Sequence, residues 1–140
     1  MIEYKPLSLS RTYYVIFDKR RGDKRWWNLF TSRGFDHVWM LTPLKTYGTI
    51  TRTLAILPMP GGCIINEWGC NIKQALQLLP KDTTAILKYT TSSEYLRNYH
   101  PSVIMSCISH CKYLLGVRGW FAITPYRLYL RLKQLGAEEI

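Results

Sequence analysis

The sequence predicts an α+β domain with an antiparallel sheet. Segments rich in β-branched and aromatic residues fill most of the first two thirds of the chain, and segments with apolar residues at helical spacing fill the last third. No internal repeat, low-complexity tract or linker interrupts this order. We therefore expect residues 1–140 to form a single domain around one hydrophobic core.

Five segments are expected to form the strands. The first, residues 12–18 (TYYVIFD), is β-branched and aromatic and ends at a charged turn that contains glycine. A turn with proline and glycine over residues 42–48 and a break at residues 58–62 (PMPGG) delimit the next three. The other strands are expected at residues 36–41, 49–57, 63–68 and 84–89.

Two short helices are expected among these strands, and each follows a residue type that caps helix N-termini. Asp23 precedes residues 24–30, and Asn71 precedes residues 72–79. Their side-chain carbonyl or carboxylate oxygens can accept hydrogen bonds from the first N–H groups of each helix.

The last third of the chain is expected to contain two further helices. One covers residues 107–115, after Ser106 as a possible N-cap and before Gly116 as a helix end. The other begins at Thr124-Pro125 and ends before Gly136. The spacing of its apolar residues predicts three inward side chains, Leu128, Leu132 and Leu135.

Cys107, at the start of the first of these helices, is the candidate nucleophile. First-turn N–H groups and the positive end of the helix dipole favour a thiolate, which is the form that attacks carbonyl groups. The alternative is that Cys107 and Cys111 are small core residues, as unpaired cysteines usually are. The stripe that faces the protein is expected to contain Cys107, Ile108, Cys111, Leu114 and Leu115.

The chain is strongly basic, with 19 Lys and Arg against 9 Asp and Glu and a net charge of +10. This balance favours a polyanionic partner such as nucleic acid or an anionic cell-wall polymer, although a solvated basic face is equally consistent with it. No motif for reading bases is present. The densest basic cluster, and thus the expected polyanion-binding face, is Lys19, Arg20, Arg21, Lys24 and Arg25.

The apolar runs and the cysteines of the sequence bear on its location and on the state of its thiols. The first residues carry no apolar signal-peptide region, and no apolar run is long enough to span a bilayer. We therefore expect a soluble protein made in the cytoplasm, without a membrane span. Four cysteines without a secretory signal favour free thiols over a disulfide framework.

A thiol nucleophile needs a histidine within hydrogen-bond reach, and the chain offers His37, His100 and His110. Side chains lean toward the N-terminus of a helix, so His110 is poorly placed to approach Cys107 from the substrate side. His100 stands in a polar loop that contains nothing to orient it. His37 opens a predicted strand, where a neighbouring strand can hold its ring, and is the expected general base.

These residues carry a resemblance to a known group. The segments WWNLF (26–30), GFDHV (34–38), CISHCKYLLG (107–116) and TPYRLY (124–129), in this order, resemble phage-encoded proteins of the circularly permuted papain-like superfamily. In that group the catalytic histidine precedes the cysteine, and the cysteine starts a helix packed on the sheet. The resemblance implies a papain-like fold, with Cys107 as nucleophile and His37 as base.

The resemblance does not clearly assign the third catalytic residue, which would orient the imidazole, to a position in this sequence. If the turn between the second and third strands is centred near Lys45, antiparallel pairing sets Thr53 opposite His37. Glu67, on the fourth predicted strand, has better chemistry for orienting an imidazole but needs a favourable strand order. The implied reaction is thiol-dependent cleavage of an amide or ester, for example in a peptide or cell-wall peptide, and it requires no cofactor.

Two other functions are consistent with the residues. A papain-like scaffold with little or no turnover can serve as a virion structural or assembly protein that binds nucleic acid or neighbouring subunits through its basic face. A metal site is the second alternative, but its cysteines lack the usual two-to-four-residue spacing of zinc knuckles, so no metal is expected. The residues considered for it are Cys63, Cys70, Cys107, His110 and Cys111.

Overall fold

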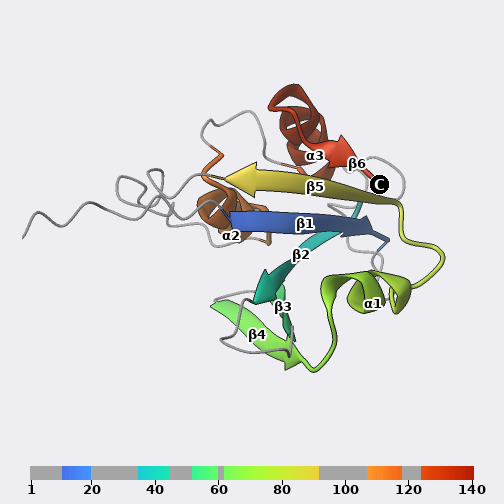
Figure 1. Ribbon diagram of the computed structural model, residues 1–140. Helices are drawn as coiled ribbons and strands as arrows, with labels where there is room; N and C mark the ends of the chain where they lie inside the picture. Colours follow the sequence, from blue (N-terminus) through green and yellow to red (C-terminus); the bar gives the residue numbers. More distant parts are fainter. Residues whose placement is uncertain (1–10, 20–34, 45–51, 60–61, 92–106, 118–123) are drawn as a thin grey trace, which may run out of the picture.

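The computed structural model describes residues 11–19, 35–44, 52–59, 62–91, 107–117 and 124–140. Over these ranges the chain forms a six-stranded antiparallel sheet and three α-helices, as Figure 1 shows. The predicted α+β class with an antiparallel sheet is therefore confirmed.

The sheet has the strand order β4-β3-β2-β1-β5-β6. The first four strands follow one another as a meander, and β5 joins the free side of β1. The strands are β1 (Arg11–Asp18), β2 (His37–Leu44), β3 (Arg52–Met59), β4 (Gly62–Trp68), β5 (Ala85–Thr91) and β6 (Glu138–Glu139).

Strands β2 and β3 run further than predicted, because two prolines lie inside them instead of ending them. The described pairing of β2 with β1 ends at Leu41, so Pro43 pairs only with β3 and does not need to donate an N–H to β1. Pro58 pairs with Cys63 near the far end of β3. Residues 42–44 of the predicted turn therefore belong to β2, and the rest of that turn lies outside the described residues.

Each face of the sheet carries its own hydrophobic core, because side chains alternate along the strands. On β1, Val15 and Phe17 face one core and Ile16 faces the other. On β2, Val38 belongs to the first core and Trp39 to the second. Buried residues on both faces explain why β1 and β2 are almost continuously apolar in the sequence.

Helices α2 (Cys107–Leu115) and α3 (Pro125–Gln134) contribute to the first core, and α1 (Ile72–Gln77) covers part of the second. Figure 1 shows α1 well apart from α2 and α3. The sheet therefore lies between α1 on one face and α2 and α3 on the other.

The helix ends agree closely with the caps predicted from the sequence. Asn71 accepts a hydrogen bond from the Gln74 N–H at 2.9 Å, and the Gln74 side chain accepts one from the Asn71 N–H, which completes a capping box. Thr124 accepts a hydrogen bond from the Arg127 N–H at 3.2 Å. After α2, Gly116 has a φ of 67°, a left-handed conformation that suits glycine.

One inward residue of the last helix was predicted wrongly. Leu128 and Leu132 are fully buried, but Leu135 is 41 % exposed because α3 ends at Gln134 and Leu135 is its C-cap. The predicted helix at residues 24–30 and the predicted cap Ser106 lie outside the described residues.

Candidate functional site

Cys107 is the first residue of α2, as predicted. The side chains of Ile108, Cys111 and Leu115 are buried in the first core, which places this stripe of the helix against the sheet. The contacts of the Cys107 thiol lie outside the described part of the structure, so its role as a nucleophile stays a prediction.

His37 is the first residue of β2 and pairs with Asp18, the last residue of β1. Because side chains alternate along β2, His37 shares a face with Trp39, and Val38 faces the α2 side. The described side chains of α2 therefore pack on the face of the sheet opposite to His37.

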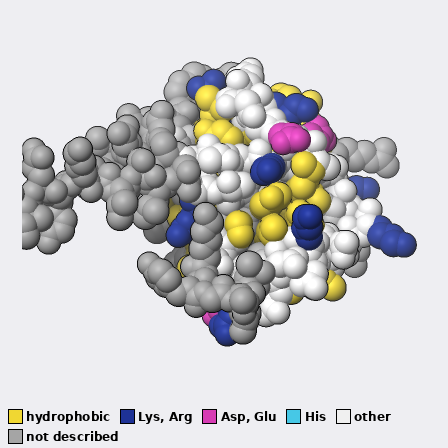
Figure 2. All heavy atoms as spheres, viewed as in Figure 1, with side chains coloured by type: hydrophobic (Ala, Val, Ile, Leu, Met, Phe, Trp, Pro, Cys, Tyr) yellow, Lys and Arg dark blue, Asp and Glu magenta, His cyan; other side chains and the backbone are white. Residues whose placement is uncertain are grey.

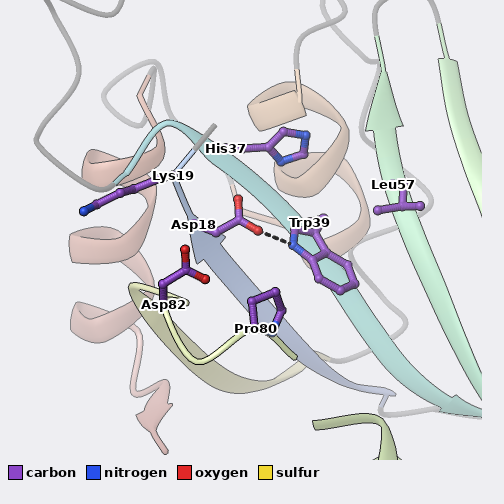
Figure 3. A pocket seen from close by; sticks show the side chains of 7 residues that line it. All are labelled: Asp18, Lys19, His37, Trp39, Leu57, Pro80 and Asp82. Carbon is purple, nitrogen blue, oxygen red and sulfur yellow. Dashed lines mark hydrogen bonds between the residues drawn. The ribbon is translucent and has the colours of Figure 1, made fainter. Parts of the chain in front are cut away.

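A pocket of about 440 Å³ opens beside His37 on this face. Strands β1, β2 and β3 and the connection between α1 and β5 supply its walls. Figure 3 shows the indole of Trp39 and the ring of Pro80 within the pocket, with the carboxyl groups of Asp18 and Asp82 on one side. The lining residues are Asp18, Lys19, His37, Trp39, Leu57, Pro80 and Asp82.

The position of the Asp18 carboxylate is set by a hydrogen bond that it accepts from the Trp39 indole N–H at 2.9 Å. Trp39 is itself held by the second core and by a tilted ring contact with Trp68 at 6.2 Å. The outcome is an acidic side chain held next to His37 at the end of the sheet (Figure 3).

The sequence reasoning missed Asp18 and Asp82 as site residues. A signal for Asp18 was present, because it is the one charged residue of the apolar segment 12–18 and ends it. Pairing the first two predicted strands as a hairpin would have set it near His37. Asp82 gave no such signal, since its place in the pocket depends on how the chain returns from α1 to β5.

Thr53 does not lie opposite His37, which corrects the predicted pairing. It pairs with Pro43, because the register of β2 and β3 is symmetric about position 48 and not about Lys45. Its side chain is fully buried and donates a hydrogen bond to the Cys70 carbonyl at 3.0 Å. Thr53 thus has a structural contact that links β3 to the segment before α1.

Glu67 is also remote from His37, because the strand order it needed is not formed. It lies on β4, and β3 separates that strand from β2. Its carboxylate accepts a hydrogen bond from the Arg52 guanidinium at 2.6 Å in an exposed ion pair. This ion pair links β3 to β4.

The described cysteines do not form a metal site. Cys63 lies on the exposed strand β4 and Cys70 lies before α1, and both are free thiols. Among the described residues, no three His, Cys, Asp or Glu side chains are grouped so that they could hold a metal ion. Local burial of the Cys63 thiol raises its pKa, which reduces its thiolate fraction at neutral pH.

Of the predicted basic cluster, Lys19 lies within the described residues, and it is exposed at the rim of the pocket. Arg20, Arg21, Lys24 and Arg25 lie outside them. Figure 2 shows Lys and Arg side chains spread around a hydrophobic patch over β1 and β5. None of the described helices is long and apolar enough to cross a membrane.

Comparisons of this chain with protein-family models, with curated proteins and with solved structures found no match.

Proposed function

We propose that the protein is a thiol hydrolase of the circularly permuted papain-like kind, with Cys107 as nucleophile and His37 as general base. The observation that carries the proposal is the pairing of His37 with Asp18 at an open pocket. A carboxylate beside an imidazole can orient the ring and stabilise its protonated form. Asp18, which pairs with His37 through the strand backbones, is the residue that we propose for the orienting role instead of Thr53 and Glu67.

The positions of the two main residues support the proposal. His37 opens β2 and Cys107 opens α2, so the histidine precedes the cysteine and the cysteine starts a helix that packs on the sheet. Because Ile108, Cys111 and Leu115 pack on the other face, the proposal requires the start of α2 to reach the end of the sheet where His37 stands.

The proposed reaction is acyl transfer to sulfur and then to water. His37 takes the proton of the Cys107 thiol, and the thiolate forms a bond to the carbonyl carbon of an amide or ester. The first-turn N–H groups of α2 stabilise the oxyanion, and the protonated His37 gives its proton to the leaving group as that bond breaks. Water, deprotonated by His37, then releases the acid and restores the thiol.

Thiol alkylation tests this assignment directly. Iodoacetamide at neutral pH should label Cys107 before Cys63, Cys70 and Cys111, and His37→Ala should slow that labelling by about tenfold because the thiolate fraction falls. His110→Ala, on the same helix as Cys107, is the matched control and should leave the rate unchanged. Faster labelling of another cysteine, or a rate that His37→Ala does not alter, would contradict the proposal.

A disulfide trap tests the geometry independently of reactivity. We expect a cysteine placed by His37→Cys to form a disulfide with Cys107 under mild oxidation, because such bonds need Cα atoms within about 7 Å. Thr90→Cys, on the exposed surface of β5, is the control that should not be trapped. Mapping by mass spectrometry that finds no link between positions 37 and 107 would count against the dyad.

A second function is favoured by the charge of the chain. With a net charge of +10, we propose as the alternative a virion structural or assembly protein that binds nucleic acid or a neighbouring subunit with little turnover. Strand β4 adds support, because this edge strand exposes Ile64 and Ile65, the latter by 63 %. An alkylation rate independent of His37 would favour this alternative.

A further inference from the structure

The two edges of the described sheet differ in length and in composition. Figure 1 shows them on opposite sides of the molecule, with β6 at one edge and β4 at the other. Strand β6 has two residues, and both are exposed glutamates. Strand β4 has seven residues and contains no Lys, Arg or Pro. Short length, charge and proline are the features that keep an edge strand from pairing with another chain, so β4 is the edge that is open to such pairing.

Apolar side chains continue to the β4 edge on both faces of the sheet. On the face of the first core, Met40 pairs with Ile56, and Ile56 pairs with Ile65. The first two of these side chains are buried, but Ile65 is 63 % exposed. On the opposite face, Leu57 pairs with Ile64, which is 44 % exposed. A further strand beside β4 would cover both isoleucines and continue both apolar rows.

The charge of β4 suits a second copy of this basic chain. Two chains that each carry a net charge of +10 repel each other, so contact between them is favoured where no cations are opposed. Glu67 is the one charged residue of β4, and its carboxylate is in an ion pair with Arg52 of β3 at 2.6 Å. The edge is therefore close to neutral, and a second copy can approach it without opposing cations.

The residues of β4 are also compatible with pairing to themselves. Ile65 is the midpoint of the strand, so antiparallel pairing about a two-fold axis at Ile65 brings all seven residues opposite a residue of the second copy. The two Ile65 side chains then lie opposite each other, and Ile64 lies opposite Asn66. Glu67 lies opposite the free thiol of Cys63, so this register opposes no like charges.

We propose that β4 is a self-association surface, at which two copies of this chain join their sheets by antiparallel β4–β4 pairing centred on Ile65. The outward backbone N–H and C=O groups of the two strands exchange hydrogen bonds, and the two Ile65 side chains pack together. The dimer goes beyond the proposed hydrolase and does not depend on it. For the alternative assembly function, it identifies the neighbouring subunit as a second copy of the chain.

Sedimentation velocity of the full chain over a range of protein concentrations tests the association. We expect a monomer–dimer equilibrium that shifts toward dimer as NaCl rises from about 0.05 to 0.5 M, because salt screens the repulsion between the two basic chains. Ile65→Lys should weaken the dimer by at least about tenfold, since it removes the apolar contact and opposes two lysines at the axis. Leu78→Lys is the matched control, because Leu78 is 70 % exposed at the end of α1 and the variant adds the same charge away from β4.

Disulfide trapping tests the register. In a Cys63→Ser background, Ile65→Cys should form a linked dimer under mild oxidation, because the two Cα atoms at the axis lie within the limit of about 7 Å. The native chain is the control, since its two Cys63 residues would lie four positions apart along the paired strands, or about 14 Å, and should not link. This measurement does not depend on the folding of Ile65→Lys, which circular dichroism checks.

Three results would overturn the proposal: a chain that is monomeric at every concentration, equal weakening of the dimer by Ile65→Lys and Leu78→Lys, or a link at Cys63 that forms as fast as the one at position 65. The outcome is separate from that of the hydrolase. A monomer whose Cys107 alkylation depends on His37 would retain the hydrolase and reject this interface. A dimer that Ile65→Lys disrupts, with alkylation independent of His37, would do the reverse.

Discussion

At the scale of single residues, the burial of two threonine hydroxyls is explained by their hydrogen-bond partners. Thr53 and Thr42 are both almost fully buried, and each hydroxyl donates to a backbone carbonyl, that of Cys70 and that of Thr12. If a buried carbonyl loses its hydrogen-bond donor, the free energy of unfolding falls by the full desolvation cost of that carbonyl. Thr53 therefore links β3 to the segment before α1, and Thr42 adds a side-chain link between β2 and β1.

Replacing Thr53 with valine should reveal this structural role. We expect Thr53→Val to lower the free energy of unfolding by about 1–2 kcal/mol, because the Cys70 carbonyl loses its donor while the side-chain shape is kept. Urea denaturation measures the change. Thr90→Val is the control, since the Thr90 hydroxyl contacts that of Thr12 at an exposed site and its loss should cost little. The alkylation rate of Cys107 should be the same in Thr53→Val as in the native chain.

Glu139 should make a small contribution to stability that depends on pH. Hydrogen bonds from Lys133 and Tyr129 lower the pKa of its carboxyl from the ordinary value of 4.5. A carboxyl whose pKa is lower in the folded state stabilises the fold above its unfolded pKa, and the effect is lost as pH falls through the folded value. The site is exposed, so solvent screening keeps the contribution small.

Urea unfolding of Glu139→Gln across pH measures this contribution. The native chain should be slightly more stable than Glu139→Gln at pH 7, and the difference should shrink as the pH falls below 4.5. Glu138→Gln, which removes a carboxylate at the adjacent position, is the matched control. A difference that persists unchanged into strong acid would mean that the carboxylate charge is not what holds β6 to α3.

At the scale of elements, the end of a helix decides which of its apolar residues reach the core. Leu128, Leu132 and Leu135 have similar spacing in the sequence, but α3 ends at Gln134 and Gly136 follows with a φ of 93°. The chain turns there, and its next residues form β6, which pairs with β5. Leu135 is consequently left at the surface.

Alanine substitutions along α3 should separate these positions. We expect Leu132→Ala to lower the free energy of unfolding by about 2–5 kcal/mol, because it leaves a cavity in the first core. Leu135→Ala should cost well under about 1 kcal/mol, as surface changes usually do. Thermal and urea denaturation of both variants provide the comparison, and equal losses would show that Leu135 packs in solution.

At the scale of the whole molecule, the net charge affects which partners bind but does not determine the fold. The net charge of +10 concentrates polyanions near the surface regardless of which residues form the core. In Figure 2 the visible Lys and Arg side chains are dispersed, and the acidic side chains lie near β6 and β4. The described side chains of this face therefore form no single basic stripe, and the densest basic cluster of the sequence remains the segment around Lys19–Arg25.

Heparin chromatography tests whether that segment is the polyanion-binding face. The native chain should be retained at low salt and released as salt rises, because binding depends on counterion release. Replacing Lys19, Arg20, Arg21, Lys24 and Arg25 with glutamine should shift elution to clearly lower salt. A control with five glutamines at Lys73, Lys81, Lys88, Arg127 and Arg131 has the same net charge. Identical elution of the two variants would assign binding to total charge and not to the cluster.

Local signals in the sequence were sufficient to place most of the described elements. Asn71, Thr124-Pro125 and Gly116 mark helix ends through contacts made within a few residues, and strands β1 and β4 follow from runs of apolar, β-branched and aromatic residues. Cys107 and His37 also fall at the starts of their elements as predicted. Contacts between residues close in the sequence determine these features, so the sequence by itself was enough to predict them.

The arrangement of the site was decided by the tertiary structure. A register symmetric about position 48 moved Thr53 away from His37, and the strand order separated Glu67 from β2. The same folding brought Asp18 beside His37 and Asp82 into one pocket with them. Register and strand order depend on which faces of the sheet become buried and on the return path of the chain, and these long-range choices leave no local pattern in the sequence.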